Sequence, residues 1–146
     1  MAEARADRLF DLWGFVIMPE HVHLVILPTD GVLIRTILTR LKRPLTARVV
    51  AWLVKNCPAF LPRMADRQPG GKNTYRFWQR GGGFDRNLRS VSDVHEKLRY
   101  IHANPVRRGL VQRPEDWPWS SARAWQTGED EPIPIDNENL PPLDCR

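Results

Sequence analysis

The sequence predicts an α+β fold in which helices pack on one face of an antiparallel sheet. Residues 12–27 contain two β-rich runs around Pro19-Glu20, a pattern typical of a tight β-hairpin. Residues 91–101 carry apolar side chains at the spacing of one helix face. A hairpin at the centre of the fold, mixed with helices, favours the α+β class. In the first strand of the hairpin, three side chains are expected to share one face: Trp13, Phe15 and Ile17.

A helix is predicted directly after the hairpin. Thr29 or Asp30 is expected to cap it, and its apolar side chains follow the helical spacing: Leu33, Ile34, Ile37, Leu38 and Leu41. Pro44 is expected to kink or end this helix, with helical sequence again at 47–54. Residues 56–74 contain three prolines and two glycines, which predicts a long mobile loop.

The second half of the chain is expected to contain two short strands and two helices. The strand-like pieces, 75–78 and 84–88, are separated by the glycines at 81–83. Ser90 or Ser92 is expected to cap a helix with one apolar face: Val91, Val94, Leu98 and Ile101. Because proline disfavours helical geometry in the residue before it, this helix is expected to end near Asn104. Three tryptophans are expected to pack a short C-terminal helix on the core: Trp117, Trp119 and Trp125.

Length and composition predict one domain over residues 1–128 and a disordered, acidic, proline-rich tail over 129–146. The sequence contains no apolar run long enough to cross a bilayer and no leader pattern, so we expect a cytoplasmic protein without a membrane partner. Cys57 and Cys145 form neither a disulfide framework nor a metal-ligand spacing.

The charge distribution favours a polyanionic partner. Seven lysines and arginines and no acidic residue lie between Asp30 and Asp66. Without residues 129–146 the chain has 21 basic and 11 acidic residues. Nucleic acid is the first candidate partner and an anionic membrane surface the second. A solvated basic helix face would explain the same pattern.

Two histidines in the second strand of the hairpin form a candidate metal site. Side chains alternate along a strand, so His21 and His23 are expected to project from one face and to be able to share an ion. Val22 and Leu24 are expected to point the other way, into the core. The alternative is a pair of polar residues on a solvated strand face.

Tyr100 and Asn104 form a second candidate pair. They are four residues apart, so they are expected to stack on one flank of the last long helix. The tyrosine could offer its hydroxyl to a cleft, and the asparagine oxygen could complete a His-His-Asn metal set. Such a set suits Mn²⁺ or Mg²⁺ and does not exclude zinc. Alternatively, Tyr100 is a boundary residue of an amphipathic helix and Asn104 a helix-ending residue before proline.

Four segments in order resemble the REP-associated tyrosine transposases, which are single-tyrosine members of the HUH nuclease superfamily. They are FVIMPEHVHLVILP (15–28), FWQRGGGFDRNLR (77–89), LRYIHANPVRRGLV (98–111) and RPEDWPWSSA (113–122). Four motifs in order are far more specific than any one of them. The resemblance covers residues 13–124.

The resemblance implies a ferredoxin-like nuclease fold, a role for each motif residue, and single-stranded or hairpin DNA as the partner of a monomer or homodimer. His21 and His23 would bind the metal, Asn104 would be the third ligand, and Tyr100 would attack a DNA phosphate. The attack would leave a 5′-phosphotyrosine and a free 3′-OH, and its reversal would join strands. Six arginines in the motifs would contact DNA: Arg80, Arg86, Arg89, Arg99, Arg107 and Arg108. Trp78 and Phe84 could stack on unpaired bases, although such aromatics more often belong to a core.

One departure from the family concerns the N-terminus. Family members usually carry a further strand and helix before the hairpin, whereas ten residues, MAEARADRLF, precede it here. An unpaired edge is therefore expected beside the histidine strand. An alternative function is an inactive remnant that binds DNA hairpins. A nucleotide hydrolase of the histidine-triad kind is disfavoured because position 25, where its third histidine would stand, is valine.

Overall fold

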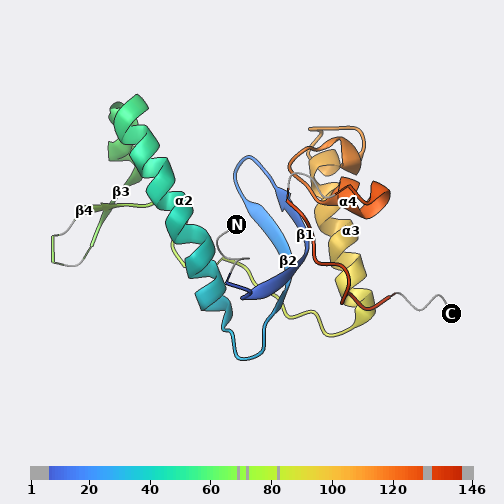
Figure 1. Ribbon diagram of the computed structural model, residues 1–146. Coiled ribbons are helices and arrows are strands. Elements are labelled where there is room, and N and C mark those ends of the chain that lie inside the picture. Colours follow the sequence, from blue (N-terminus) through green and yellow to red (C-terminus); the bar gives the residue numbers. More distant parts are fainter. Residues whose placement is uncertain (1–6, 69, 72, 82, 130–132, 143–146) are drawn as a thin grey trace. The chain divides into compact units, whose positions relative to one another are not determined.

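The computed structural model describes residues 7–68, 70–71, 73–81, 83–129 and 133–142, and the chain forms two compact units. The first unit comprises Met1–Leu9 and Gly31–Asp85, and the second comprises Phe10–Asp30 and Arg86–Arg146. Each unit combines helices with a small antiparallel sheet (Figure 1). The α+β class is therefore confirmed.

The sheets differ from the expectation. In the second unit, β1 (Phe10–Ile17) pairs with β2 (Val22–Pro28), and in the first unit β3 (Ala65–Arg67) pairs with β4 (Asn73–Tyr75). The strands of the described residues thus form two separate two-stranded sheets and not one sheet with helices on one face. The β3 and β4 strands have three residues each, and within the described part of the chain they pair with one another and extend no larger sheet.

The predicted hairpin is confirmed, but its first strand is buried on both faces. The pairing shifts between Leu12 and Gly14, so Trp13 is the extra residue of a β-bulge. Leu12, Trp13, Phe15 and Val16 are all buried. The bulge interrupts the alternation of faces, and the expectation of a single apolar face therefore does not describe this strand.

Helix α3 (Val91–Arg107) packs along the hairpin and forms the core of the second unit (Figure 1). The Ser90 hydroxyl caps it by accepting a hydrogen bond from the Asp93 N–H, which confirms the expected start. The core cluster contains residues of both elements: Trp13, Val16, Met18, Val25, Val94, Leu98 and Ile101. The helix continues three residues beyond Asn104, because buried Pro105 is accommodated in its last turn and the Arg108 N–H still bonds the Asn104 carbonyl.

The segment after α3 covers the outer edge of β1. It contains the 3-10 helix η2 (Pro114–Asp116) and helix α4 (Ala122–Thr127). The indole N–H groups of Trp117 and Trp125 donate to the carbonyls of Ile17 and Trp13, as expected for packed tryptophans. Trp119, in contrast, is 54% exposed, so the expectation was wrong for this residue.

Part of the predicted disordered tail is ordered. The Leu12 N–H donates to the Asp136 carboxylate at 2.8 Å, and the Trp13 indole donates to Asn139 at 3.0 Å. Ile135 is buried and Leu140 packs against the core. Residues 133–142 therefore depart from the expectation because they satisfy polar groups of β1, whereas 130–132 and 143–146 lie outside the described residues.

The first unit is built on helix α2 (Ile34–Asn56), which continues through Pro44. Its N-cap is Leu33, without a side-chain cap, so the expected capping by Thr29 or Asp30 was wrong. The predicted loop 56–74 contains the 3-10 helix η1 (Pro58–Met64), β3 and the start of β4. Residues 84–88 form no strand, and Phe84 is 90% exposed.

None of the described helices is both long enough and apolar enough to span a membrane.

Candidate metal and tyrosine site

The two histidines lie together at the start of β2. His21 immediately precedes the strand and His23 is its second residue. Their Nε2 atoms are 3.1 Å apart, and their rings meet edge to face with centroids 4.7 Å apart. The structure therefore brings both predicted metal ligands into contact.

Tyr100 on α3 lies next to this pair. Its ring centroid is 6.3 Å from that of His23, and the side chain is 40% exposed. The Lys97 ammonium lies 4.4 Å and the Arg107 guanidinium 4.9 Å from the centre of the tyrosine ring. The hydroxyl-bearing ring is thus partly open to solvent, with the His23 imidazole and two cations next to it.

The histidines lie on the strand face that α3 covers. His23 pairs with Val16 and Val25 pairs with Gly14 across the hairpin, and both valines belong to the core shared with α3. Val22 and Leu24, on the other face, are half-buried. The expectation that these two residues point into the core was wrong, and burial of the histidine face explains how Tyr100 reaches His23.

Electrostatics near the histidines favour a neutral His23. Burial lowers the pKa of His23, and the nearby charges of His21 and Lys97 lower it further. A neutral imidazole is the form that binds metals. Glu20 lies on the opposite side of His21, with its carboxylate 3.7 Å from Nδ1, and also forms an ion pair with Arg108. The Arg108 hydrogen bond holds the pKa of Glu20 below its usual range.

The histidine pair fits a shared metal ion in its geometry. Two nitrogens bound to one ion at about 2.1 Å and at right angles would lie about 3 Å apart, close to the separation observed here. Asn104, the predicted third ligand, is half-buried one turn beyond Tyr100. In the described part of the chain, no three His, Cys, Asp or Glu side chains form a metal-binding cluster. Asn104 or a water ligand would therefore have to complete the coordination.

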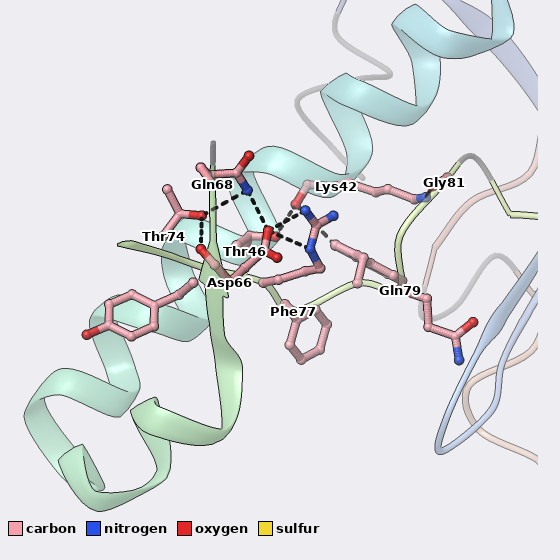
Figure 2. A pocket seen from close by; sticks show the side chains of 11 residues that line it. Lys42, Thr46, Asp66, Gln68, Thr74, Phe77, Gln79 and Gly81 are labelled. Atoms are coloured by element: carbon pink, nitrogen blue, oxygen red, sulfur yellow. Dashed lines mark hydrogen bonds and ion pairs between the residues drawn. The ribbon is translucent and has the colours of Figure 1, made fainter. Parts of the chain in front are cut away.

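Five of the six predicted DNA-binding arginines are exposed in the second unit: Arg86, Arg89, Arg99, Arg107 and Arg108. Arg80 belongs to the first unit, where it pairs with the buried Asp66 at 2.6 Å. Figure 2 shows Asp66 bonded to Gln68 and Thr74 of the β3–β4 hairpin. The predicted set is thus divided between the two units.

Sequence reasoning missed two polar residues around the site and one buried histidine on α3. Lys97 precedes Tyr100 by one helical turn and Glu20 adjoins His21, so spacing could have suggested both. His102 is buried on α3, its Nε2 lies 2.8 Å from the Ser121 hydroxyl, and burial lowers its pKa to about 4. No local pattern marks His102, because its partner is 19 residues away.

Two curated proteins resemble the chain over most of its length. One, from Haemophilus influenzae, is assigned as a REP-associated tyrosine transposase and is 32% identical over 115 residues, covering 77% of this chain and 58% of its own. The REP-associated tyrosine transposase of Escherichia coli K12 is 25% identical over 122 residues, covering 82% and 58%. The chain is a homologue of REP-associated tyrosine transposases. It spans less than two thirds of the length of either relative, and no protein-family model matches it.

The fold also resembles a solved structure. A REP-associated tyrosine transposase bound to a REP hairpin matches with a TM-score of 0.58 and 22% identity, over 98% of this chain and 72% of that chain. At this identity the match supports the fold.

Proposed function

We propose that the chain is a metal-dependent single-stranded DNA endonuclease and strand transferase. The observation that carries the proposal is the contact of Tyr100 with His23, which itself lies 3.1 Å from His21. A nucleophile next to a pair of metal-binding side chains is the arrangement that phosphoryl transfer needs. The homology to transposases supports the same reaction class.

In the proposed step, the Tyr100 hydroxyl oxygen attacks a DNA phosphorus while the bond from phosphorus to the 3′ oxygen breaks. The tyrosine loses its proton, the leaving oxygen gains one as a 3′-OH, and the 5′ end stays on Tyr100 as a phosphotyrosine. Attack by another 3′-OH reverses the step and joins strands. Lys97 and Arg107 flank the ring and can hold the phosphate in place.

A divalent ion, Mg²⁺ or Mn²⁺, would be held by His21, His23 and Asn104 and would neutralise charge that develops on the phosphate. Hairpin DNA is the proposed substrate, since the structural neighbour binds a REP hairpin. The five exposed arginines of the second unit would contact its phosphates. The ferredoxin-like nuclease fold, a single catalytic domain over 1–128 and a cytoplasmic location belong to the same proposal.

The test is a denaturant-resistant protein–DNA adduct formed with a cleavable hairpin and Mn²⁺. The Tyr100→Phe variant keeps the ring and removes the attacking oxygen, so it should give no adduct. Tyr75→Phe is the matched control, because Tyr75 is similarly exposed, at 43%, but belongs to the first unit. An adduct that persists in Tyr100→Phe would refute the assignment of the nucleophile.

A second candidate function is hairpin binding without cleavage. One observation favours it: among the described residues, β2 has only β1 as a strand partner. An open edge beside the histidines would loosen the metal geometry, and small misplacements cost much of a rate. Tight hairpin binding with no adduct at any Mn²⁺ concentration would support this candidate.

A further inference from the structure

The first unit carries an aromatic groove that the reaction at Tyr100 does not use. The groove lies between α2 and η1 and has a volume of about 680 Å³. We define the aromatic groove by three rings and three arginines: Trp52, Phe60, Phe77, Arg48, Arg63 and Arg76. Buried Leu53 and Met64 form part of its lining.

The three rings are more exposed than packing alone would leave them. Trp52 is 61% exposed, Phe77 46% and Phe60 41%. Single exposed apolar side chains are ordinary, but neighbouring ones that line a common groove mark a binding surface. The groove has the size of a ligand site. The Arg63 guanidinium lies over the Phe60 ring, 5.6 Å from its centre, whereas Trp52 is the most exposed of the three rings.

The charge around the groove selects a polyanion. Its lining includes three arginines and no acidic residue. Residues 31–85 contain eleven lysines and arginines and only two aspartates, Asp66 and Asp85. Asp66 is buried against Arg76 and Arg80 and offsets part of their charge, so Arg48 and Arg63 supply most of the positive charge of the lining. An acidic phosphate backbone therefore complements this surface better than a neutral or basic partner does.

One arginine of the groove is held in a fixed orientation. The Arg76 Nε donates to the Asp66 carboxylate at 2.9 Å, and a second guanidinium nitrogen donates to the same oxygen. Asp66 is held in turn by Gln68 at 2.6 Å (Figure 2). Arg76 and Phe77 also line a neighbouring pocket of about 280 Å³. A fixed guanidinium beside an exposed ring can pair with a phosphate while a base stacks on the ring.

We propose that the aromatic groove binds unpaired nucleotides that extend from the DNA hairpin, by stacking their bases on Trp52, Phe60 and Phe77. Bases in a duplex are already stacked on one another, so only an unpaired segment can use these rings. The arginines bind the phosphates of that segment. This inference rests on DNA as the proposed substrate, and it does not depend on cleavage at Tyr100.

The test compares two labelled hairpins with the same stem, one blunt and one with an unpaired extension. Affinities of the full chain are measured by fluorescence anisotropy. Wild type should prefer the extended hairpin, and Trp52→Ala and Phe77→Ala should each lose affinity for it on the order of tenfold, with no change for the blunt hairpin. Trp119→Ala is the matched control, because Trp119 is 54% exposed but belongs to the second unit and does not line the groove.

Three results would overturn the proposal: no preference for the extension in wild type, an equal loss for both hairpins, or unchanged affinity in the variants. The other occupant to distinguish is a second copy of the chain, and analytical sedimentation does so. If Trp52→Ala dissociates a wild-type dimer without loss of extension binding, the groove is an interface between copies. Arg63→Gln keeps all three rings and should also weaken extension binding, which guards against a folding defect. If extension binding depends on Trp52 but no protein–DNA adduct forms at Tyr100, the proposed cleavage reaction is refuted and the proposal for the groove stands.

Discussion

The carboxylate of Glu20 lies 3.7 Å from Nδ1 of His21, on the side of the ring opposite the Nε2 that faces His23. This separation is longer than a hydrogen bond, but a small movement of the Glu20 side chain would let it accept from Nδ1–H, and a carboxylate so bonded orients a metal-binding histidine and raises its basicity as a ligand. Glu20 and His21 are adjacent in sequence, at the turn between β1 and β2. The turn itself therefore holds a carboxylate beside the first proposed metal ligand.

Glu20→Gln should weaken Mn²⁺ binding by about tenfold, because loss of such a partner costs 10- to 100-fold in metal affinity. Isothermal titration of the full chain measures the effect. Glu115→Gln is the control, since Glu115 pairs with Arg113 and belongs to another part of the same unit. Equal affinity of wild type and Glu20→Gln would show that Glu20 does not act on the metal site.

The combined His21→Ala and His23→Ala substitution should abolish the Mn²⁺ site. Both Nε2 donors are removed, and Asn104 and water cannot replace two imidazoles. His95→Ala is the control for loss of an imidazole, because the His95 Nε2 instead lies 3.0 Å from the carbonyl of Pro141. Retention of a stoichiometric site in the double variant would place the metal elsewhere.

Asp66 should contribute stability that is lost in acid. The hydrogen bond from Arg76 holds the pKa of Asp66 below its usual value, and Arg80 adds to this effect. The folded carboxyl therefore stays charged where the unfolded one begins to bind a proton, so its contribution is present above about pH 4 and disappears below it. The free energies of unfolding of wild type and Asp66→Asn should differ at pH 6 and converge toward pH 2, as measured in urea. A constant difference across that range would contradict this account.

The elements that the sequence predicted well are those whose pattern is formed by residues close together in the chain. The hairpin around Pro19-Glu20 and the cap of α3 at Ser90 depend on residues close in the chain. The path of α2 through Pro44 was less predictable, because a proline costs a helix hydrogen bond and other interactions decide whether the helix continues. The order of residues 133–142 depends on bonds to β1 from more than 120 residues away, such as that between Leu12 and Asp136.

The site was predictable to a similar degree. Alternation along a strand was enough to place His21 and His23 side by side, and the observed contact agrees. The approach of Tyr100 to His23 joins two elements, so spacing alone could not establish it. Val22 and Leu24 were expected in the core and are only half-buried, because they are as apolar as buried Val25 and the pattern does not show which face α3 covers.

Gly14→Ala should destabilise the second unit by about 1–3 kcal/mol, the usual cost of overpacking. A Cβ at this position would lie 2.4 Å from Cδ2 of Leu98 and 3.3 Å from the Ser121 hydroxyl. Leu98 is buried in the core, so it has little room to move. Urea unfolding measures the loss. Because the clash involves the Leu98 side chain, adding Leu98→Ala should give a total loss smaller than the sum of the two single losses, and strict additivity would rule out this contact as the cause.

Lys97 and Arg107 should set part of the salt dependence of DNA binding. Both cations lie over the Tyr100 ring, where the scissile phosphate must arrive if Tyr100 is the nucleophile. Each phosphate contact that is lost reduces the slope of log affinity against log salt by about 0.7–0.9. The double variant Lys97→Gln and Arg107→Gln should therefore lower the slope by roughly 1.5, measured with a hairpin substrate between 50 and 200 mM salt.

Arg113→Gln should leave the slope unchanged, because carboxylates of Asp116 and Glu115 already engage its guanidinium. An equal slope in wild type and the double variant would mean that neither cation contacts a phosphate, and the proposed path of DNA past Tyr100 would then be wrong.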